Sequence, residues 1–79
     1  MEIRFYAGAA DAAGTTATTL EAGDLSAEEL MTRLAGPDEA LARVLACCSL
    51  LADGAPVRNR ADRISGGARV DVLPPFAGG

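Results

Sequence analysis

The last six residues, Pro74-Pro75-Phe76-Ala77-Gly78-Gly79, form the segment whose residue types point most directly to chemistry. Two consecutive prolines keep a chain extended and cannot donate to a strand ladder, so we expect them to end a strand and hold the tail away from the body. Gly78 and Gly79 carry no Cβ atom, and a bare backbone can enter a channel too narrow for other residues. The sequence therefore predicts chemistry at the terminal carboxyl group of Gly79.

The composition indicates that the rest of the chain does not supply catalytic groups. It contains no His, which is the commonest general base near neutral pH and the commonest metal ligand. The two cysteines, Cys47 and Cys48, are adjacent, so a disulfide between them would be strained, and a zinc site would need more thiols or histidines. We expect no catalysis by the chain alone and no bound metal or cofactor. We also expect one cysteine inside the core and the other at its margin.

The charge balance disfavours nucleic acids and membranes as partners. All seven cations are Arg, against eleven Asp and Glu, and the resulting net charge of −4 repels phosphate groups. Glu2 and Arg4 lie where an export signal would need an apolar stretch, and the longest nearly apolar run, residues 44–52, is too short to cross a bilayer. We therefore expect a cytoplasmic protein that binds neither nucleic acid nor membrane.

The length of 79 residues predicts one domain with a thin core. Beyond 17 Ala, the chain has 22 larger apolar side chains, which suffice for a core but leave none to line a large cavity. No repeat or linker divides the chain. We expect residues 1–73 to form the domain and residues 74–79 to form the extended tail.

The first third of the chain predicts two strands. Residues 2–7 alternate, with Ile3, Phe5 and Ala7 on one face, which is typical of a strand with one buried side. Residues 8–14 are almost all Ala and Gly and predict a loop or a helical turn. Residues 15–21 are rich in β-branched Thr and predict the second strand.

Two helices are expected next. Ser26 followed by Glu29 forms a capping-box pattern, and Leu25 can pack on Leu30, so we expect a helix over residues 27–35. Gly36 and Pro37 end it, and the acidic residues after Pro37 suit the first turn of a second, shorter helix.

The remaining strands complete the expected fold. Residues 48–52 predict a strand, and Asp53-Gly54 predicts a hairpin turn into an edge piece around Val57. Residues 69–73 predict the last strand, with its two Val facing inward and Leu73 outward. This order predicts an α+β fold of the β-grasp type, a mixed sheet of four to five strands packed on one main helix plus a short second helix.

Several segments together resemble a known family, the MoaD-type sulfur carriers that form the small subunit of molybdopterin synthase, which share a ubiquitin-like β-grasp fold with the ThiS-type carriers. The resemblance covers essentially the whole chain, and the tail is its most specific part. The segments that carry it are Ile3-Arg4-Phe5-Tyr6-Ala7, Asp62-Arg63-Ile64, Gly66-Gly67, Val70-Asp71-Val72 and Pro74-Pro75-Phe76-Ala77-Gly78-Gly79.

This resemblance implies a non-catalytic carrier that works through partners. A ubiquitin-activating-type adenylyltransferase would use ATP to convert the Gly79 carboxylate to an acyl-adenylate, and a sulfur donor would replace AMP to give a thiocarboxylate. The tail, from Pro74 to Gly78, would insert into the large synthase subunit and deliver sulfur for molybdopterin. Partner binding is expected at Tyr6, Leu73 and Val57, which match the family's docking patch.

Other functions that use a Gly-Gly terminus stay open at this point. Related carriers supply sulfur for cysteine or thiamin thiazole synthesis, although their tails less often contain two prolines. A ubiquitin-like modifier of lysines is a second alternative, and the absence of Lys would prevent lysine-linked chains of this protein. A plain protein-binding domain with an inert tail is the third.

Overall fold

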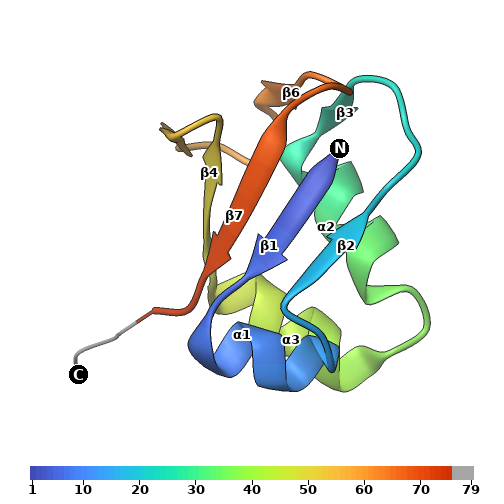
Figure 1. Ribbon diagram of the computed structural model, residues 1–79, viewed down its shortest axis with the longest axis vertical. Coiled ribbons are helices and arrows are strands. Elements are labelled where there is room, and N and C mark those ends of the chain that lie inside the picture. Colours follow the sequence, from blue (N-terminus) through green and yellow to red (C-terminus); the bar gives the residue numbers. More distant parts are fainter. Residues whose placement is uncertain (76–79) are drawn as a thin grey trace.

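A mixed five-stranded sheet with helices against one of its faces forms the body of the molecule, and the computed structural model describes residues 1–75 (Figure 1). The sheet order is β2-β1-β7-β4-β5, in which the central pair β1 and β7 is parallel and the other pairs are antiparallel. A separate two-stranded ladder joins β3 and β6. The elements are β1 (Glu2–Phe5), α1 (Ala7–Ala13), β2 (Ala17–Thr19), β3 (Leu25–Ser26), α2 (Ala27–Ala35), α3 (Glu39–Cys47), β4 (Ser49–Ala52), β5 (Ala55–Val57), β6 (Arg63–Ile64) and β7 (Arg69–Leu73).

The predicted α+β fold with a mixed sheet is confirmed. The helix α2 has the predicted bounds, and the Ser26 side chain accepts from the Glu29 amide while the Glu29 carboxylate accepts from the Ser26 amide, so the capping box is complete. Beyond Gly36, Asp38 caps α3 by accepting from the Leu41 amide. This second helix is as long as α2, nine residues each, rather than shorter, because the N-cap at Asp38 begins a helix that runs to Cys47.

Alternation in β1 and β7 builds the core. Ile3, Val70 and Val72 point to the helices and are at most 1% exposed, and Leu30 of α2 and Leu45 of α3 pack against them with the same burial. Each such side chain stabilises the fold by about 1.5–3 kcal/mol relative to an exposed one. The same alternation fixes which β7 side chains face away from the helices.

The chain differs from the sequence prediction just after β1. The strand ends at Phe5 instead of Ala7, because Ala7 adopts a positive φ of 49° and begins α1, where a loop or helical turn was expected. Ala7 is consequently exposed. The expectation of one cysteine inside the core was also wrong, since Cys47 is exposed at the end of α3 and Cys48 is half-buried.

The longest helices in residues 1–75 have nine residues, and none of the helices there combines the length and the hydrophobicity that a membrane span requires.

Candidate functional site

The strand β7 sets where the tail leaves the body. It lies between β1 and β4 in the centre of the sheet, and its register with both strands is fixed by inward-facing Val70 and Val72. The strand ends at Leu73, and Pro74 and Pro75 carry the chain away from the sheet (Figure 1). The predicted tail residues Phe76, Ala77, Gly78 and Gly79 lie outside the described residues.

Tyr6 lies beside the root of the tail. Its amide donates to the Val72 carbonyl at 3.1 Å, so it continues the β1–β7 pairing one step beyond Phe5 and stands next to Leu73. Its hydroxyl donates to Asp71 Oδ1 at 3.3 Å, and the side chain is 42% exposed. The structure therefore brings together two of the predicted docking residues, Tyr6 and Leu73, on the outward face of the sheet.

The third predicted docking residue, Val57, lies on the other face of the sheet. It pairs directly with Leu50, which is 3% exposed and packs in the core, so both side chains point toward the helices. Its role in partner binding stays a prediction, but any contact that it makes belongs to a different surface from that of Tyr6 and Leu73.

Two apolar residues on the outward face were missed by sequence reasoning. Leu51 lies opposite Asp71 of β7 and Pro56 of β5, so both apolar side chains share the face of Leu73. The parity of β4 could have placed Leu51 outward, but its neighbour Leu50 is equally apolar and obscures the alternation. We call Tyr6, Leu51, Pro56 and Leu73 the outer patch.

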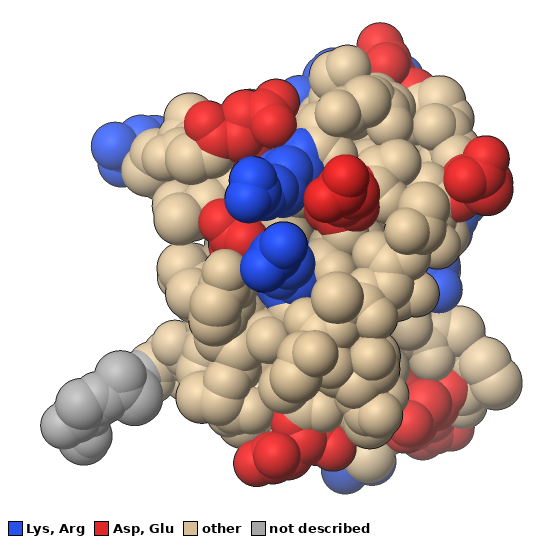
Figure 2. All heavy atoms as spheres, in the orientation of Figure 1, with Lys and Arg blue, Asp and Glu red and all other residues tan. Residues whose placement is uncertain are grey.

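Charged residues surround the outer patch without giving it a net charge. Glu2 of β1 lies opposite Arg69 of β7, and Arg4 lies opposite Asp71, so the signs cancel across the strand pair. Figure 2 shows charged side chains of both signs over the upper half of this face, with an uncharged area below them beside the exit of the tail. Such a surface, apolar and next to the tail, suits the docking of a protein that receives the tail.

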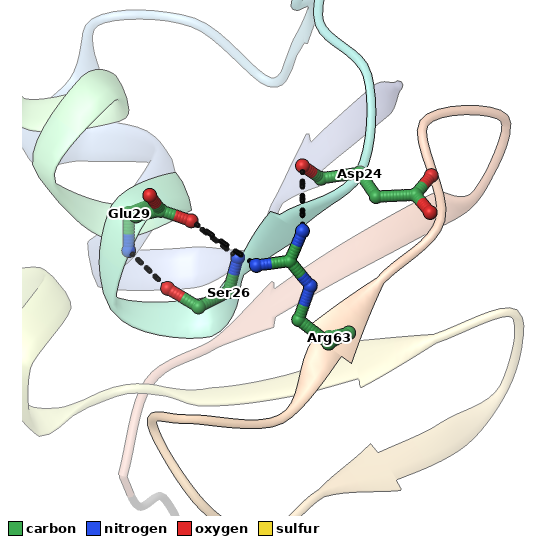
Figure 3. Close-up of polar contacts among 4 residues, drawn as sticks. All are labelled: Asp24, Ser26, Glu29 and Arg63. Carbon is green, nitrogen blue, oxygen red and sulfur yellow. Dashed lines mark hydrogen bonds and ion pairs between the residues drawn. The ribbon is translucent and has the colours of Figure 1, made fainter.

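The opposite end of β7 is held by a polar network (Figure 3). The side-chain carboxylate of Asp24 accepts a hydrogen bond from the Gly66 amide at 3.0 Å, and the backbone carbonyl of Asp24 accepts one from Arg63 Nη2 at 3.4 Å. The hydrogen bond from the Ser26 amide, then that from its hydroxyl, lower the pKa of Glu29, and Arg63, 3.8 Å away, acts in the same direction. This network fixes the turn that leads into β7.

The surroundings of Cys48 disfavour its reactive thiolate form. Burial, and then the neighbouring Cys47, raise the pKa of the Cys48 thiol, which donates to the Val44 carbonyl at 3.2 Å. Within residues 1–75, no group of three potential ligands could hold a metal ion. The candidate site is the tail with the outer patch beside its root, since β7 brings the two together.

Comparisons with known proteins agree with this fold. SAMP1 from Haloferax volcanii shares it with a TM-score of 0.78 and 24% identity, over 100% of this chain and 98% of that one. A second structure, H. volcanii small archaeal modifier protein 1, has a TM-score of 0.76 and 22% identity, over 96% of this chain and 97% of that one. The complex of subunits 1 and 2 of molybdopterin-converting factor from Helicobacter pylori 26695 contains a similar chain. Its TM-score is 0.67 and its identity 22%, over 99% of this chain and 96% of that one.

These neighbours have the ubiquitin-like β-grasp fold, which confirms the predicted fold class. No curated protein matches the chain. The model of the ThiS family matches residues 3–79, which include all of the sheet except Glu2 at the start of β1. Proteins of the ThiS and MoaD type are small carriers or modifiers without catalysis of their own. The chain belongs to the ThiS family.

Proposed function

We propose that this protein is a sulfur carrier that works as the small subunit of a molybdopterin synthase. The observation that carries the proposal is the combination of ThiS family membership with a tail that leaves the central strand after Leu73, beside the apolar outer patch. The complex of two molybdopterin-converting factor subunits, one of them similar to this chain, supports a large subunit as the partner.

The proposed chemistry takes place at the carboxylate of Gly79. A carboxylate is a poor electrophile, so it must first be activated. In the site of an adenylyltransferase, a carboxylate oxygen attacks the α-phosphorus of ATP, which releases pyrophosphate and forms an acyl-adenylate. A sulfide-equivalent donor then attacks the acyl carbon, the bond to the AMP oxygen breaks, and AMP leaves. The resulting thiocarboxylate passes its sulfur to the pterin precursor in the large subunit, and hydrolysis returns the carboxylate.

The body contributes position rather than catalysis in this scheme. The pairing of Tyr6 with the end of β7 fixes the direction in which the tail leaves, and the outer patch gives a partner an apolar surface to cover. Pro74 and Pro75 keep the tail from folding back into the ladder, since neither residue can donate a backbone hydrogen bond.

The test is the intact mass of the protein after incubation with ATP, the adenylyltransferase and a sulfide donor. We expect the mass increase that replaces one oxygen by sulfur, and no increase for the variant that lacks Gly79. Adding the large subunit and the pterin precursor to the thiocarboxylate should then give molybdopterin. A thiocarboxylate that forms but gives no molybdopterin would assign the carrier to another sulfur pathway, such as cysteine or thiazole synthesis.

A protein modifier is the second candidate, and the similarity to small archaeal modifier protein 1 favours it. Since Arg69 is the last basic residue, trypsin would leave residues 70–79 attached to any modified lysine. Mass spectrometry of a cell extract for lysines that carry this remnant distinguishes the two roles. Such lysines, lost when Gly79 is deleted, would establish conjugation.

A further inference from the structure

A groove lies on the helix side of the sheet, separate from the outer patch. It has a volume of about 260 Å³ between α2, the start of β4 and the end of β5. Its apolar lining includes Met31, Leu50 and Val57, while Arg58 and Arg60 stand in the loop that follows β5. We call it the α2–β5 groove. No acidic residue lines it, although the protein as a whole carries a net charge of −4.

The loop that carries the two arginines is fixed by hydrogen bonds. The carboxylate of Asp62 accepts from the amides of Arg58 and Asn59, at 3.2 and 3.1 Å. The carbonyls of Arg60 and Asp62 accept from the first amides of α2, Glu28 and Ala27, at 3.0 and 2.9 Å. The loop therefore supplies partners that the helix N-terminus lacks: residues 60–62 bond to α2, and the start of the loop is tied to Asp62.

The two guanidinium groups keep their charge available. In the part of the chain that the structure describes, neither Arg58 nor Arg60 lies within ion-pair distance of a carboxylate, and the Asp62 carboxylate is bonded to backbone amides. Arg60 donates to the Ala46 carbonyl at a long 3.5 Å, and both residues are exposed. A cationic rim thus stands over an apolar floor in an otherwise acidic protein.

The groove opens close to the root of the tail. Ser49 lines the groove and pairs directly with Leu73, the last residue of β7. Paired strands lie about 4.8 Å apart, so a protein that encloses the tail from Pro74 onward comes within reach of the groove. The proposed function requires at least one such protein, because the carboxylate must be activated before it reacts.

We propose that the α2–β5 groove binds an acidic segment with one apolar side chain on the protein that activates the tail. The apolar side chain would fill the floor at Met31 and Val57, and the flanking carboxylates would meet Arg58 and Arg60. This inference rests on the proposed function, and it gives Val57 a docking role on a surface different from the outer patch. Complementary charge at such a rim chiefly raises the rate of association.

A titration of the isolated protein tests the chemistry of the groove. The probes are the peptide Glu-Asp-Leu-Asp-Glu, its basic counterpart Lys-Lys-Leu-Lys-Lys and inorganic phosphate, followed by NMR. We expect the acidic peptide to shift the methyl signals of Met31 and Val57 and the amide signal of Arg58, with an effect that fades as salt is added. Equal shifts with the basic peptide, or shifts scattered over the surface, would overturn the proposal. Full methyl shifts with phosphate alone would show a simple anion site instead.

A matched pair of charge reversals tests the partner. Arg58→Glu and Arg43→Glu change the net charge equally, but Arg43 is exposed on α3 and does not line the groove. In thiocarboxylate formation we expect Arg58→Glu to raise KM about fivefold with kcat unchanged, because an attractive charge pair at the exposed rim becomes repulsive. Arg43→Glu should have the KM and kcat of the wild type. Equal KM values for the two variants would reject the groove as the binding site.

The outcome for the wild type separates this inference from the proposed function. If the wild type gains no sulfur, the carrier function fails, while the peptide titration still decides whether the groove binds acidic apolar segments. If the wild type gains sulfur and Arg58→Glu behaves like Arg43→Glu, the carrier function stands and only the groove is rejected.

Discussion

The two ends of β7 differ in what holds them. At the start of the strand, which we call the turn end, Arg63 donates a hydrogen bond to the Asp24 carbonyl (Figure 3). The amides of Gly66 and Arg69 donate to the carboxylates of Asp24 and Asp53. At the finish, which we call the tail end, Tyr6 contributes one backbone and one side-chain bond, and beyond it the chain leaves the sheet. Side-chain contacts thus hold the chain where β7 begins, whereas the end of the strand is paired with β4 through Ser49 and then releases the tail.

This division suits a carrier. A tail that must enter other proteins cannot also be anchored to its own body, so the strand that bears it has to be held firmly up to the residue where the tail begins. Val70, near the turn end, and Val72, near the tail end, are both fully buried, so the core holds the strand along its length and only the chain beyond Leu73 leaves it. Substitutions at the turn end should therefore change the free energy of unfolding, whereas those at the tail end should change binding.

The largest effect on unfolding is expected at Gly66. A Cβ atom on this residue would lie 2.7 Å from the Ala22 carbonyl oxygen and 3.0 Å from a backbone carbon of Gly23, and backbone atoms cannot move aside cheaply. We expect Gly66→Ala to destabilise the protein by about 1–3 kcal/mol, as overpacking does elsewhere. Urea denaturation measures the change.

The adjacent glycine provides the control for this prediction. A Cβ atom on Gly67 would meet nothing within 4 Å, and no positive φ constrains the residue. Gly67→Ala should leave the free energy of unfolding within about 0.5 kcal/mol of the wild type, since nothing in its surroundings must shift. Equal destabilisation by the two substitutions would contradict the close approach at Gly66.

The next effect concerns the cap of α2 at the same end. Ser26→Ala removes the acceptor for the Glu29 amide, and we expect a loss of about 1 kcal/mol in the free energy of unfolding. Ser26→Asn keeps an acceptor at the N-cap and should restore most of the stability in the same denaturation experiment. If Asn fails to restore it, the cap does not explain the loss.

Much of the fold was predictable from local signals of this kind. The capping box at Ser26 predicted the bounds of α2, Asp53-Gly54 predicted a hairpin at which both residues have positive φ, and Pro56 placed β5 at an edge. These signals work because one or two residues determine the backbone locally. The β7 strand was likewise predicted with its observed bounds, since Val70 and Val72 alternate with residues of the other face.

The remaining features depend on contacts that a single sequence does not display. The helix α1 has no acidic residue in its first turn and no side-chain cap, so nothing local marked its start, and packing of Ala9 into the core stabilises it instead. The inward direction of Val57 follows from its register with Leu50, which only the assembled sheet reveals. The groove beside it joins three separate stretches of the chain, residues 27–31, 46–50 and 57–60, and was not predicted for the same reason.

A smaller effect at the turn end should depend on pH. The hydrogen bond from the Ser26 amide lowers the pKa of Glu29 below its ordinary value of 4.5, so the charged form is favoured in the folded state. Its contribution to stability is present above that ordinary value and is lost as the pH falls through the lower pKa of the folded state. We expect the free energy of unfolding of the wild type to fall over this acidic range.

The variant Glu29→Gln isolates this contribution. Gln can still accept from the Ser26 amide in a capping box, but it does not titrate. Denaturation at several pH values below 5 should show a shallower decline for the variant than for the wild type. Parallel curves would mean that Glu29 does not contribute to the acid dependence.

The smallest effect on unfolding, and a large effect on binding, are expected at the tail end. Leu73 is half-buried on the outward face, and the long stem of an Arg can cover the same surface, so Leu73→Arg should change the free energy of unfolding by less than about 1 kcal/mol. The charge would enter the apolar outer patch, where a docked partner leaves it without water or a counterion. We expect weaker binding to the large subunit by calorimetry, with thiocarboxylate formation retained at high adenylyltransferase concentration. If this variant unfolds under conditions in which the wild type is folded, Leu73 is needed for the stability of the fold. The two ends of β7 would then not differ in their effect on unfolding.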